Sequence, residues 1–321
     1  MKRAVVFAYH NVGVRCLSVL LAHGVEIVKI VTHQDSPTET IWFDSVAEFG
    51  KLHQIPVITP DDPNDPAIVA ELVATQPDFL FSFYYRLMLK APLLALPRSG
   101  AFNMHGSLLP KYRGRVPVNW AIVHGERETG ATLHEMLEKP DAGGIVAQQA
   151  VPILPDDTAA EVFNKVTVAA EIALSHALPE LLAGTSSPKP QNLAAGSYFG
   201  GRKAEDGRID WMQPAKVIHN LIRAVAPPYP GAFSDTTKGR IRVLHSIYRA
   251  NEKSNGGVPS LFARGNRLFA ECGDGGVLEL LAVELLPHDS TAQPDILSSG
   301  AFPTIFGSSS FPLTSNANTF P

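Results

Sequence analysis

The chain has 321 residues, of which 45% are hydrophobic and 18% charged, and its formal net charge is −4. This is the composition of a globular protein, and its length suggests two domains. The acidic balance argues against a surface built to bind nucleic acid, and two distant cysteines argue against a disulfide-stabilised extracellular fold.

The chain begins with MKRAVVFAYHN, in which a short apolar run ends at His10 and Asn11. The run is too short for a signal peptide, so we expect it to be a first strand. We expect no membrane insertion, since no stretch resembles a membrane helix of about 20 apolar residues. The expected location is the cytoplasm, with Cys16 and Cys272 reduced.

Strand and helix patterns alternate along the first hundred or so residues. Runs rich in β-branched and aromatic residues predict strands at 4–9, 26–32, 56–59, 79–83 and 100–104. Amphipathic spacing predicts helices at 14–21, 45–53, 68–75 and 118–123. This alternation predicts an α/β fold with a mostly parallel sheet covered by helices on both faces.

The next segment departs from this alternation. The runs 131–137 and 145–153 are expected to pair as strands around the loop EKPDAGG. A long helix is predicted over 158–182, with capping residues at 156–158 and a stop at Gly184.

The remaining sequence suggests a second, smaller domain. GTSSPKPQ at 184–191 has the composition of a linker, and three later β-rich segments predict a small barrel or open sheet. The predicted division is 1–184 for the α/β domain, 185–204 for the linker, 205–286 for the barrel-like domain and 287–321 for a tail. The tail lacks Lys and Arg and is rich in Ser, Thr, Pro and Asn, so we expect disorder there.

NMHGSLLPKYRGR, residues 103–115, contains the first candidate site. Asn103 and His105 lie two residues apart at a strand end, so their side chains share one face at the sheet edge where ligands bind. An amide N–H can stabilise an oxyanion, and an imidazole can act as acid or base near neutral pH. Asp141, in the later Pro-Asp-Ala-Gly-Gly loop, is a candidate carboxylate partner. The residues alone leave a purely structural role for all three open.

Other patterns in this region are weaker indications of a functional site. Ser107 follows His105 but lacks the Gly-x-Ser-x-Gly spacing of a serine nucleophile. His134-Glu135 lacks the second histidine of a zinc helix and falls in a predicted strand, so no metal is expected. The basic residues of the loop are either a solvated face or anion contacts; they are Lys111, Arg113 and Arg115.

Two longer stretches carry a resemblance to a known family. NMHGSLLPKYRGRVPVNWAIVHGERETGATLHEM followed by DAGGIVAQ, and later GRIDWMQPAKVIHNLIRAVAPPYPGAF, resemble the 10-formyltetrahydrofolate-dependent formyltransferases. The resemblance spans roughly residues 1 to 285. It implies the formyltransferase fold, a Rossmann-like catalytic domain followed by an OB-like barrel, with 10-formyltetrahydrofolate as formyl donor and no metal.

The resemblance also implies roles for individual residues. Asn103 matches the oxyanion-stabilising amide, His105 the acid/base, and Asp141 the carboxylate that raises the pKa of the imidazole. Further positions match contacts with the folate; they are Leu87, Met88, Leu89, Arg115, Leu137, Glu138, Lys139, Pro140 and Asp141.

The acceptor of the formyl group is less sharply implied. VVFAYHNVG, FSFYYR and HGSLLPKYRGR are most similar to family members that formylate UDP-4-amino-4-deoxy-L-arabinose for lipid A modification and polymyxin resistance. Methionyl-tRNA, another amino sugar and a non-catalytic remnant are the alternatives. The expected partner is a nucleotide sugar rather than nucleic acid, and the expected state is a monomer.

Overall fold

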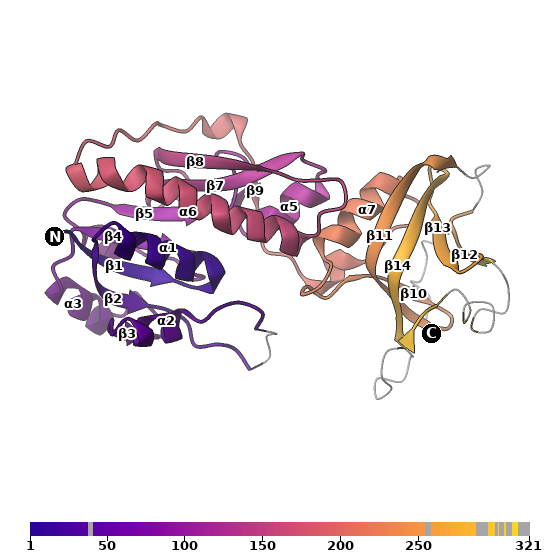
Figure 1. Cartoon of the computed structure of the whole chain (residues 1–321), viewed down its shortest axis with the longest axis horizontal. Helices are drawn as coiled ribbons and strands as arrows, with labels where there is room; N and C mark the ends of the chain where they lie inside the picture. The colour runs from indigo at the N-terminus through magenta and orange to yellow at the C-terminus, as the bar shows by residue number, and fades with distance from the viewer. Residues whose placement is uncertain are drawn as a thin grey trace. The chain divides into compact units, whose positions relative to one another are not determined.

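The computed structural model describes residues 1–37, 41–253, 258–286, 295–298, 301, 305 and 310–313. The chain divides into two compact units (Figure 1). Unit 1 consists of Met1–Pro117, Glu128–Pro152 and Phe163–Gly201, and unit 2 of Val118–Arg127, Ile153–Val162 and Arg202–Pro321. The predicted linker therefore lies mostly within unit 1.

Unit 1 is built on a seven-stranded sheet in the order β3-β2-β1-β4-β5-β7-β8. The strands are β1 (Arg3–Ala8), β2 (Glu26–Val31), β3 (Val57–Ile58), β4 (Phe79–Phe83), β5 (Ala101–His105), β7 (Glu128–Glu135) and β8 (Ile145–Pro152). The first five pair in parallel, whereas β7 is antiparallel to both β5 and β8. The predicted mostly parallel sheet and the predicted pairing of the last two strands are both confirmed.

Helices connect and cover these strands. They are α1 (His10–Ala22), α2 (Val46–Leu52), α3 (Pro66–Ala74), α4 (Ala91–Leu94) and α6 (Ala159–Ala183). Helix α1 begins at His10, four residues before its predicted start, and only Tyr9 separates it from β1. His10 itself has a φ of 67°. Helices α1 and α6 lie side by side in Figure 1, joined by Arg15 to Glu171 and by His23 Nε2 to Ser175 Oγ at 3.0 Å.

Helix α6 is, among the described residues, long and apolar enough to cross a membrane by length and composition. Half of its most apolar window is buried inside the structure. A core helix of a soluble protein passes the same test, so this helix is only weak evidence of a membrane span.

Unit 2 contains an antiparallel sheet in the order β10-β11-β14-β13-β12-β16, with β15 also pairing with β14. Its strands are β10 (Ala232–Thr236), β11 (Gly239–Lys253), β12 (Ser260–Arg264), β13 (Arg267–Glu271), β14 (Gly276–Leu286), β15 (Asp295–Ile296) and β16 (Ser310–Pro312). Helix α7 (Ala215–Ala224), most of helix α5 (Pro117–Val123) and the 3₁₀ turn Ala204–Gly207 also belong to unit 2. The 3₁₀ turn Leu193–Ala195 and the short paired strands β6 (Arg113–Gly114) and β9 (Tyr198–Phe199) belong to unit 1. The predicted small β domain is confirmed as an open half-barrel.

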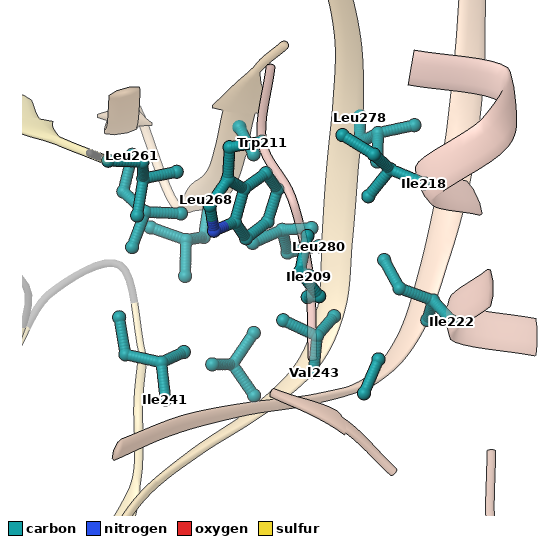
Figure 2. Close-up of a cluster of buried hydrophobic side chains, with 14 of the residues drawn as sticks. Ile209, Trp211, Ile218, Ile222, Ile241, Val243, Leu261, Leu268, Leu278 and Leu280 are labelled. Atoms are coloured by element: carbon teal, nitrogen blue, oxygen red, sulfur yellow. The ribbon is translucent and has the colours of Figure 1, made fainter. Parts of the chain in front are cut away.

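The core of unit 2 surrounds Trp211, whose side chain is fully buried (Figure 2). Ile218 and Ile222 of α7 face Val243, Leu278 and other apolar side chains of the sheet. Burying this apolar surface is the main stabilising term of the unit.

Short described parts of the predicted tail pair with the sheet of unit 2, whereas composition predicted disorder or poor packing throughout 287–321. Strands β15 and β16 pair with β14 and β12, and Leu297 and Leu313 belong to the buried core of unit 2. Composition averages over the whole segment and therefore misses two single leucines that are buried in an existing core. The rest of that range lies outside the described residues.

Candidate active site

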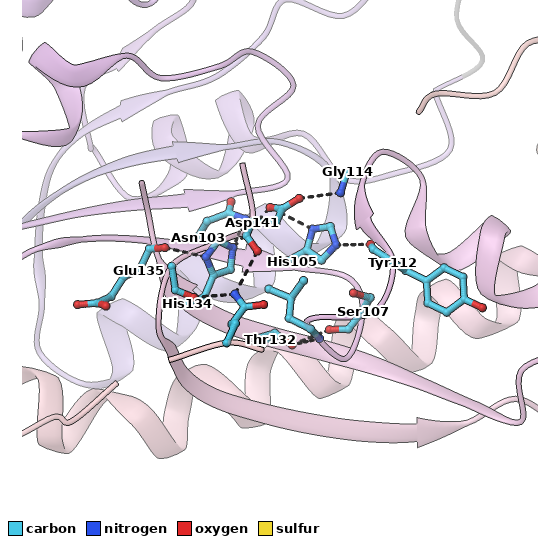
Figure 3. A network of polar contacts seen from close by, with 12 residues as sticks. Asn103, His105, Ser107, Tyr112, Gly114, Thr132, His134, Glu135 and Asp141 are labelled. Atoms are coloured by element: carbon cyan, nitrogen blue, oxygen red, sulfur yellow. Dashed lines mark hydrogen bonds and ion pairs between the residues drawn. The ribbon is translucent and has the colours of Figure 1, made fainter. Parts of the chain in front are cut away.

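The candidate site lies where β5 ends, between β4 and β7. Asn103 stands opposite His134 of β7 in the antiparallel register, and His105 stands opposite Thr132. Side chains of directly opposed residues lie on the same face of a sheet. The register therefore adds His134 to the pair Asn103 and His105, and all three lie together in Figure 3.

His105 is held between a backbone carbonyl and a carboxylate, and its side chain is almost fully buried. Nε2 lies 2.8 Å from the carbonyl oxygen of Tyr112, and Nδ1 lies 3.6 Å from Asp141 Oδ1 (Figure 3). A carbonyl oxygen can only accept a hydrogen bond, so Nε2 carries a proton and donates it. In the neutral ring, Nδ1 is therefore the basic atom, and it faces Asp141.

Asp141 lies in the turn between β7 and β8, in a left-handed backbone conformation with φ of 50°. Its Oδ2 accepts a hydrogen bond from the backbone N–H of Gly114 at 2.8 Å, while Oδ1 lies 3.6 Å from both His105 Nδ1 and His134 Nε2. The sequence prediction that Asn103, His105 and Asp141 come together holds in this geometry. Two loops far apart in the sequence meet at this carboxylate.

The two ionisable groups of the pair shift in the same direction. Burial lowers the pKa of His105, and this outweighs Asp141 and the Tyr112 carbonyl, which favour the charged ring. Burial alone raises the pKa of Asp141, but His105, His134 and the Gly114 N–H together bring it well below its ordinary value. The expected effect of Asp141, which raises the pKa of His105, is present, but removal of the ring from water outweighs it.

His134 is a site residue that sequence reasoning considered only as a metal ligand. Its Nδ1 donates to the carbonyl oxygen of Glu135 at 2.8 Å, which leaves Nε2 of the neutral ring as an acceptor. Nε2 lies 3.1 Å from Nδ2 of Asn103 and so accepts one of its two N–H bonds. The second N–H of the Asn103 amide is not used in this contact with His134. An imidazole within the strand ATLHEM was the available signal, but its partner depends on the β5–β7 register.

Comparison with protein families decides where the chain belongs. Residues 15–178 match the model described as "Formyl transferase", and residues 202–297 match the model described as "Formyl transferase, C-terminal domain". The chain belongs to the formyl transferase family. The resemblance found in the sequence is confirmed.

Solved structures with the same fold include several formyltransferases. An N-formyltransferase from Helicobacter canadensis, in complex with folinic acid and dTDP-3-aminofucose, is 21% identical, with a TM-score of 0.71 over 87% of this chain and 99% of that one. WlaRD, a sugar 3N-formyltransferase studied with dTDP and 5-N-formyl-THF, is 22% identical, with a TM-score of 0.66 over 87% and 97% of the two chains. HypX from Aquifex aeolicus, in complex with tetrahydrofolic acid, is 20% identical, with a TM-score of 0.62 over 94% of this chain and 46% of that one.

The residues that match folate contacts of the formyl transferase family differ in their exposure to solvent. Leu87, Met88 and Leu137 are apolar but exposed, whereas Leu89 is buried in the cluster that also holds Phe7. Met136, directly before Leu137, packs against the same apolar cluster as Leu89. The predicted folate-contacting segments 87–89 and 137–141 therefore both lie next to this cluster.

The other predicted contacts lie on exposed loops. Glu138, Lys139 and Arg115 are exposed, and Pro140 is half-buried. The backbone N–H of Arg115 donates to the carbonyl oxygen of Phe199 at 2.9 Å. The guanidinium of Arg113 approaches the carbonyl oxygen of Leu193 at 3.5 Å.

Ser107 has a structural role. Its side chain is fully buried, and its hydroxyl donates to the carbonyl oxygen of Lys111 at 2.6 Å. Its own carbonyl accepts from the hydroxyl of Thr132, also at 2.6 Å. The hydroxyl thus closes the loop after β5 rather than facing a substrate. The described residues contain no group of three or more His, Cys, Asp or Glu placed to hold a metal ion.

Proposed function

We propose that this chain transfers a formyl group from 10-formyltetrahydrofolate to the amine of a nucleotide-linked amino sugar. The observation that carries the proposal is the arrangement of an amide, an imidazole and a carboxylate at one sheet edge, with Asp141 3.6 Å from His105. These groups supply what formyl transfer between two nitrogens requires: an oxyanion donor and a proton carrier.

Each residue of the trio has a distinct proposed role. The second N–H of Asn103 stabilises the oxyanion that forms when the amine attacks the formyl carbon. Such a donor typically contributes about 3 kcal/mol. The Nδ1 atom of His105 takes the proton lost by the amine and returns it to the nitrogen that leaves as the carbon–nitrogen bond breaks. Asp141 stabilises the imidazolium while it carries that proton.

The surroundings of the trio fit a folate as formyl donor. Leu87, Met88 and Leu137 offer exposed apolar surface on loops next to the site, and a pteridine ring needs an apolar wall. Arg115 is an exposed cation that suits a folate carboxylate. The complexes of folinic acid, 5-N-formyl-THF and tetrahydrofolic acid with proteins of the same fold support this assignment.

As acceptor we propose UDP-4-amino-4-deoxy-L-arabinose, whose formylation serves lipid A modification and polymyxin resistance. The support is the local sequence resemblance in VVFAYHNVG, FSFYYR and HGSLLPKYRGR. Two proteins of the same fold carry dTDP or a dTDP-sugar, which supports a nucleotide sugar in general. The net charge of −4 favours a sugar over tRNA, whose phosphates require a basic surface.

The test is release of tetrahydrofolate by purified protein supplied with 10-formyltetrahydrofolate and one acceptor at a time. The acceptors are UDP-4-amino-4-deoxy-L-arabinose, dTDP-3-aminofucose and methionyl-tRNA. We expect turnover with the UDP sugar and none with tRNA. Turnover with the dTDP sugar alone would correct the acceptor, and turnover with tRNA alone would refute the nucleotide-sugar class.

A further inference from the structure

The segment that links the two sequence-predicted domains lies across both loops of the active site. Its composition, GTSSPKPQ and the residues that follow, predicted a linker. In the structure, Lys189 forms an antiparallel bridge with Ile145, and β9 (Tyr198–Phe199) pairs in parallel with β6 (Arg113–Gly114). One stretch of 11 residues, 189–199, thus touches the chain just after Asp141 and just after His105.

Ser197 fixes the peptide group that binds His105. The N–H of Arg113 donates to the carbonyl oxygen of Ser197 at 3.0 Å. That N–H belongs to the same rigid peptide plane as the Tyr112 carbonyl, which accepts from Nε2 of His105 at 2.8 Å. The hydroxyl of Ser197 accepts from the N–H of Tyr112 at 2.8 Å. Ser197 therefore holds both peptide groups that flank the Tyr112 α-carbon.

Phe199 continues the same attachment two residues further along the chain. Its carbonyl oxygen accepts from the N–H of Arg115 at 2.9 Å, and its ring stacks on Tyr112 with centroids 5.4 Å apart. Gly114 lies between Tyr112 and Arg115 in the sequence, and its N–H donates to Asp141. A Cβ on Gly114 would lie 2.1 Å from the Phe199 carbonyl oxygen, so the two segments approach as closely as a glycine allows.

Gln191 fixes the other loop. Its side-chain nitrogen donates to the carbonyl oxygens of Asp141, at 3.1 Å, and Gly143, at 2.6 Å. On either side of it, Lys189 exchanges two backbone hydrogen bonds with Ile145, both at 2.8 Å, and Ser197 holds the first loop. The single side chain of Gln191 thus ties the turn that presents the catalytic carboxylate.

Both loops need such support because their backbones are strained. Tyr112 and Asp141 have φ values of 56° and 50°, a region that non-glycine residues adopt at a cost of about 1–3 kcal/mol each. Such conformations persist only where surrounding contacts determine them. The contacts described above come from one continuous segment outside the sheet.

We propose that residues 189–199 form a positioning strap for the catalytic network, with Gln191 and Ser197 as its two positioning residues. Ser197 acts on His105 through the backbone on both sides of the Tyr112 α-carbon, and Gln191 acts on Asp141 through the turn backbone. The inference rests on the proposed function for its kinetic part only, since the strap itself is a property of the two loops.

The first test is amide hydrogen exchange, which needs no substrate. We expect Ser197→Ala to increase exchange at residues 112–115, and Gln191→Met to increase exchange at 141–145, with little change in the global melting temperature. Ser187→Ala, the same substitution at an exposed serine two residues before the strap, is the matched control and should change neither region. Unchanged exchange in both loops of both strap variants would overturn the proposal.

The second test is kinetic and separates positioning from a general structural role. Ser197→Ala should lower kcat about 10-fold or more, because small displacements of catalytic groups are costly, with little effect on KM. Ser197→Thr, which keeps the hydroxyl, should recover most of the loss. In a His105→Ala background, Ser197→Ala should cause no further loss, because residues that act as a unit are not additive. An equal fold-loss in both backgrounds would contradict action through His105. If wild-type protein transfers no formyl group at all, the proposed function fails, and hydrogen exchange alone decides the strap.

Discussion

At the residue scale, His105 experiences two opposing influences. The carboxylate of Asp141 and the carbonyl of Tyr112 favour its charged form, while burial favours the neutral form and lowers its pKa below 6.5. A neutral imidazole at pH 7 suits a residue that must first accept a proton from an amine. In the proposed mechanism, Asp141 then stabilises the imidazolium once His105 has taken the proton.

Asp141→Asn tests this balance. The substitution removes the charge that raises the pKa of His105, so the pKa should fall further below 6.5, and formyl transfer should fall by roughly 10²-fold or more. The measurement is an NMR titration of the His105 ring in both proteins, with kcat determined alongside. A higher His105 pKa in the variant would contradict the stated role of the carboxylate.

His134→Phe tests the proposed orientation of the Asn103 amide. Phenylalanine has no ring nitrogen to accept the N–H that Asn103 donates to His134 Nε2, so the Asn103 amide loses its fixed orientation. We expect kcat to fall about 10-fold to 100-fold with KM nearly unchanged, since the contact matters in the transition state. His134→Gln, which can present an oxygen acceptor, should retain more activity than the Phe variant. Equal and near-wild-type kcat in both would remove His134 from the site.

At the element scale, the long helix α6 shows how local sequence determines a boundary. The backbone N–H of Thr158 donates to Glu161 at 2.6 Å, and the N–H of Glu161 approaches the hydroxyl of Thr158 at 3.4 Å. This reciprocal pair is a capping box. Of the three predicted capping residues at 156–158, Thr158 is the one that makes this pair.

Thr158→Ala should therefore destabilise the protein by about 1 kcal/mol, the usual cost of losing a hydroxyl cap. Formyl transfer should be unaffected at temperatures where the protein is folded, since Thr158 lies outside the site. Urea denaturation of the wild type, Thr158→Ala and Thr158→Ser measures this, with the Ser variant expected near wild type. Equal stability of all three proteins would show that the box contributes nothing.

The elements also mark where sequence reasoning ends. Alternating periodicity predicted the sheet, and the motif predicted Asn103, His105 and Asp141, because both are local or family-wide patterns. His134 and Ser197 escaped prediction because their roles depend on pairings between strands far apart in sequence, β5 with β7 and β6 with β9. The strap could not be predicted from its linker-like composition, because Pro, Ser and Gly are typical of irregular backbone whether or not that backbone packs.

At the scale of the whole molecule, three histidines link stability to pH. Burial is the main cause that lowers the pKa of His105 and His219, and burial together with Arg86 lowers the pKa of His33 to about 4. Their unfolded values are near 6.5. Below pH 6.5 the unfolded chain therefore binds more protons than the folded one.

The free energy of unfolding should accordingly be highest above pH 6.5 and decrease as the pH falls toward 4. Each proton of difference steepens the dependence by about 1.4 kcal/mol per pH unit. Urea unfolding at pH 7, 6 and 5 measures the slope, and His33→Gln, which removes one titrating group, should flatten it. A stability that rises on acidification over this range would contradict the lowered pKa values.

The central claim is that the network at the end of β5 performs formyl transfer to an amino sugar. The most direct measurement is the rate of tetrahydrofolate release from 10-formyltetrahydrofolate with UDP-4-amino-4-deoxy-L-arabinose, for the wild type and a folded His105→Ala variant. We predict turnover by the wild type and a loss of about 10²-fold or more in the variant. Near-wild-type turnover in His105→Ala, or none in a folded wild type with any amino sugar, would contradict it.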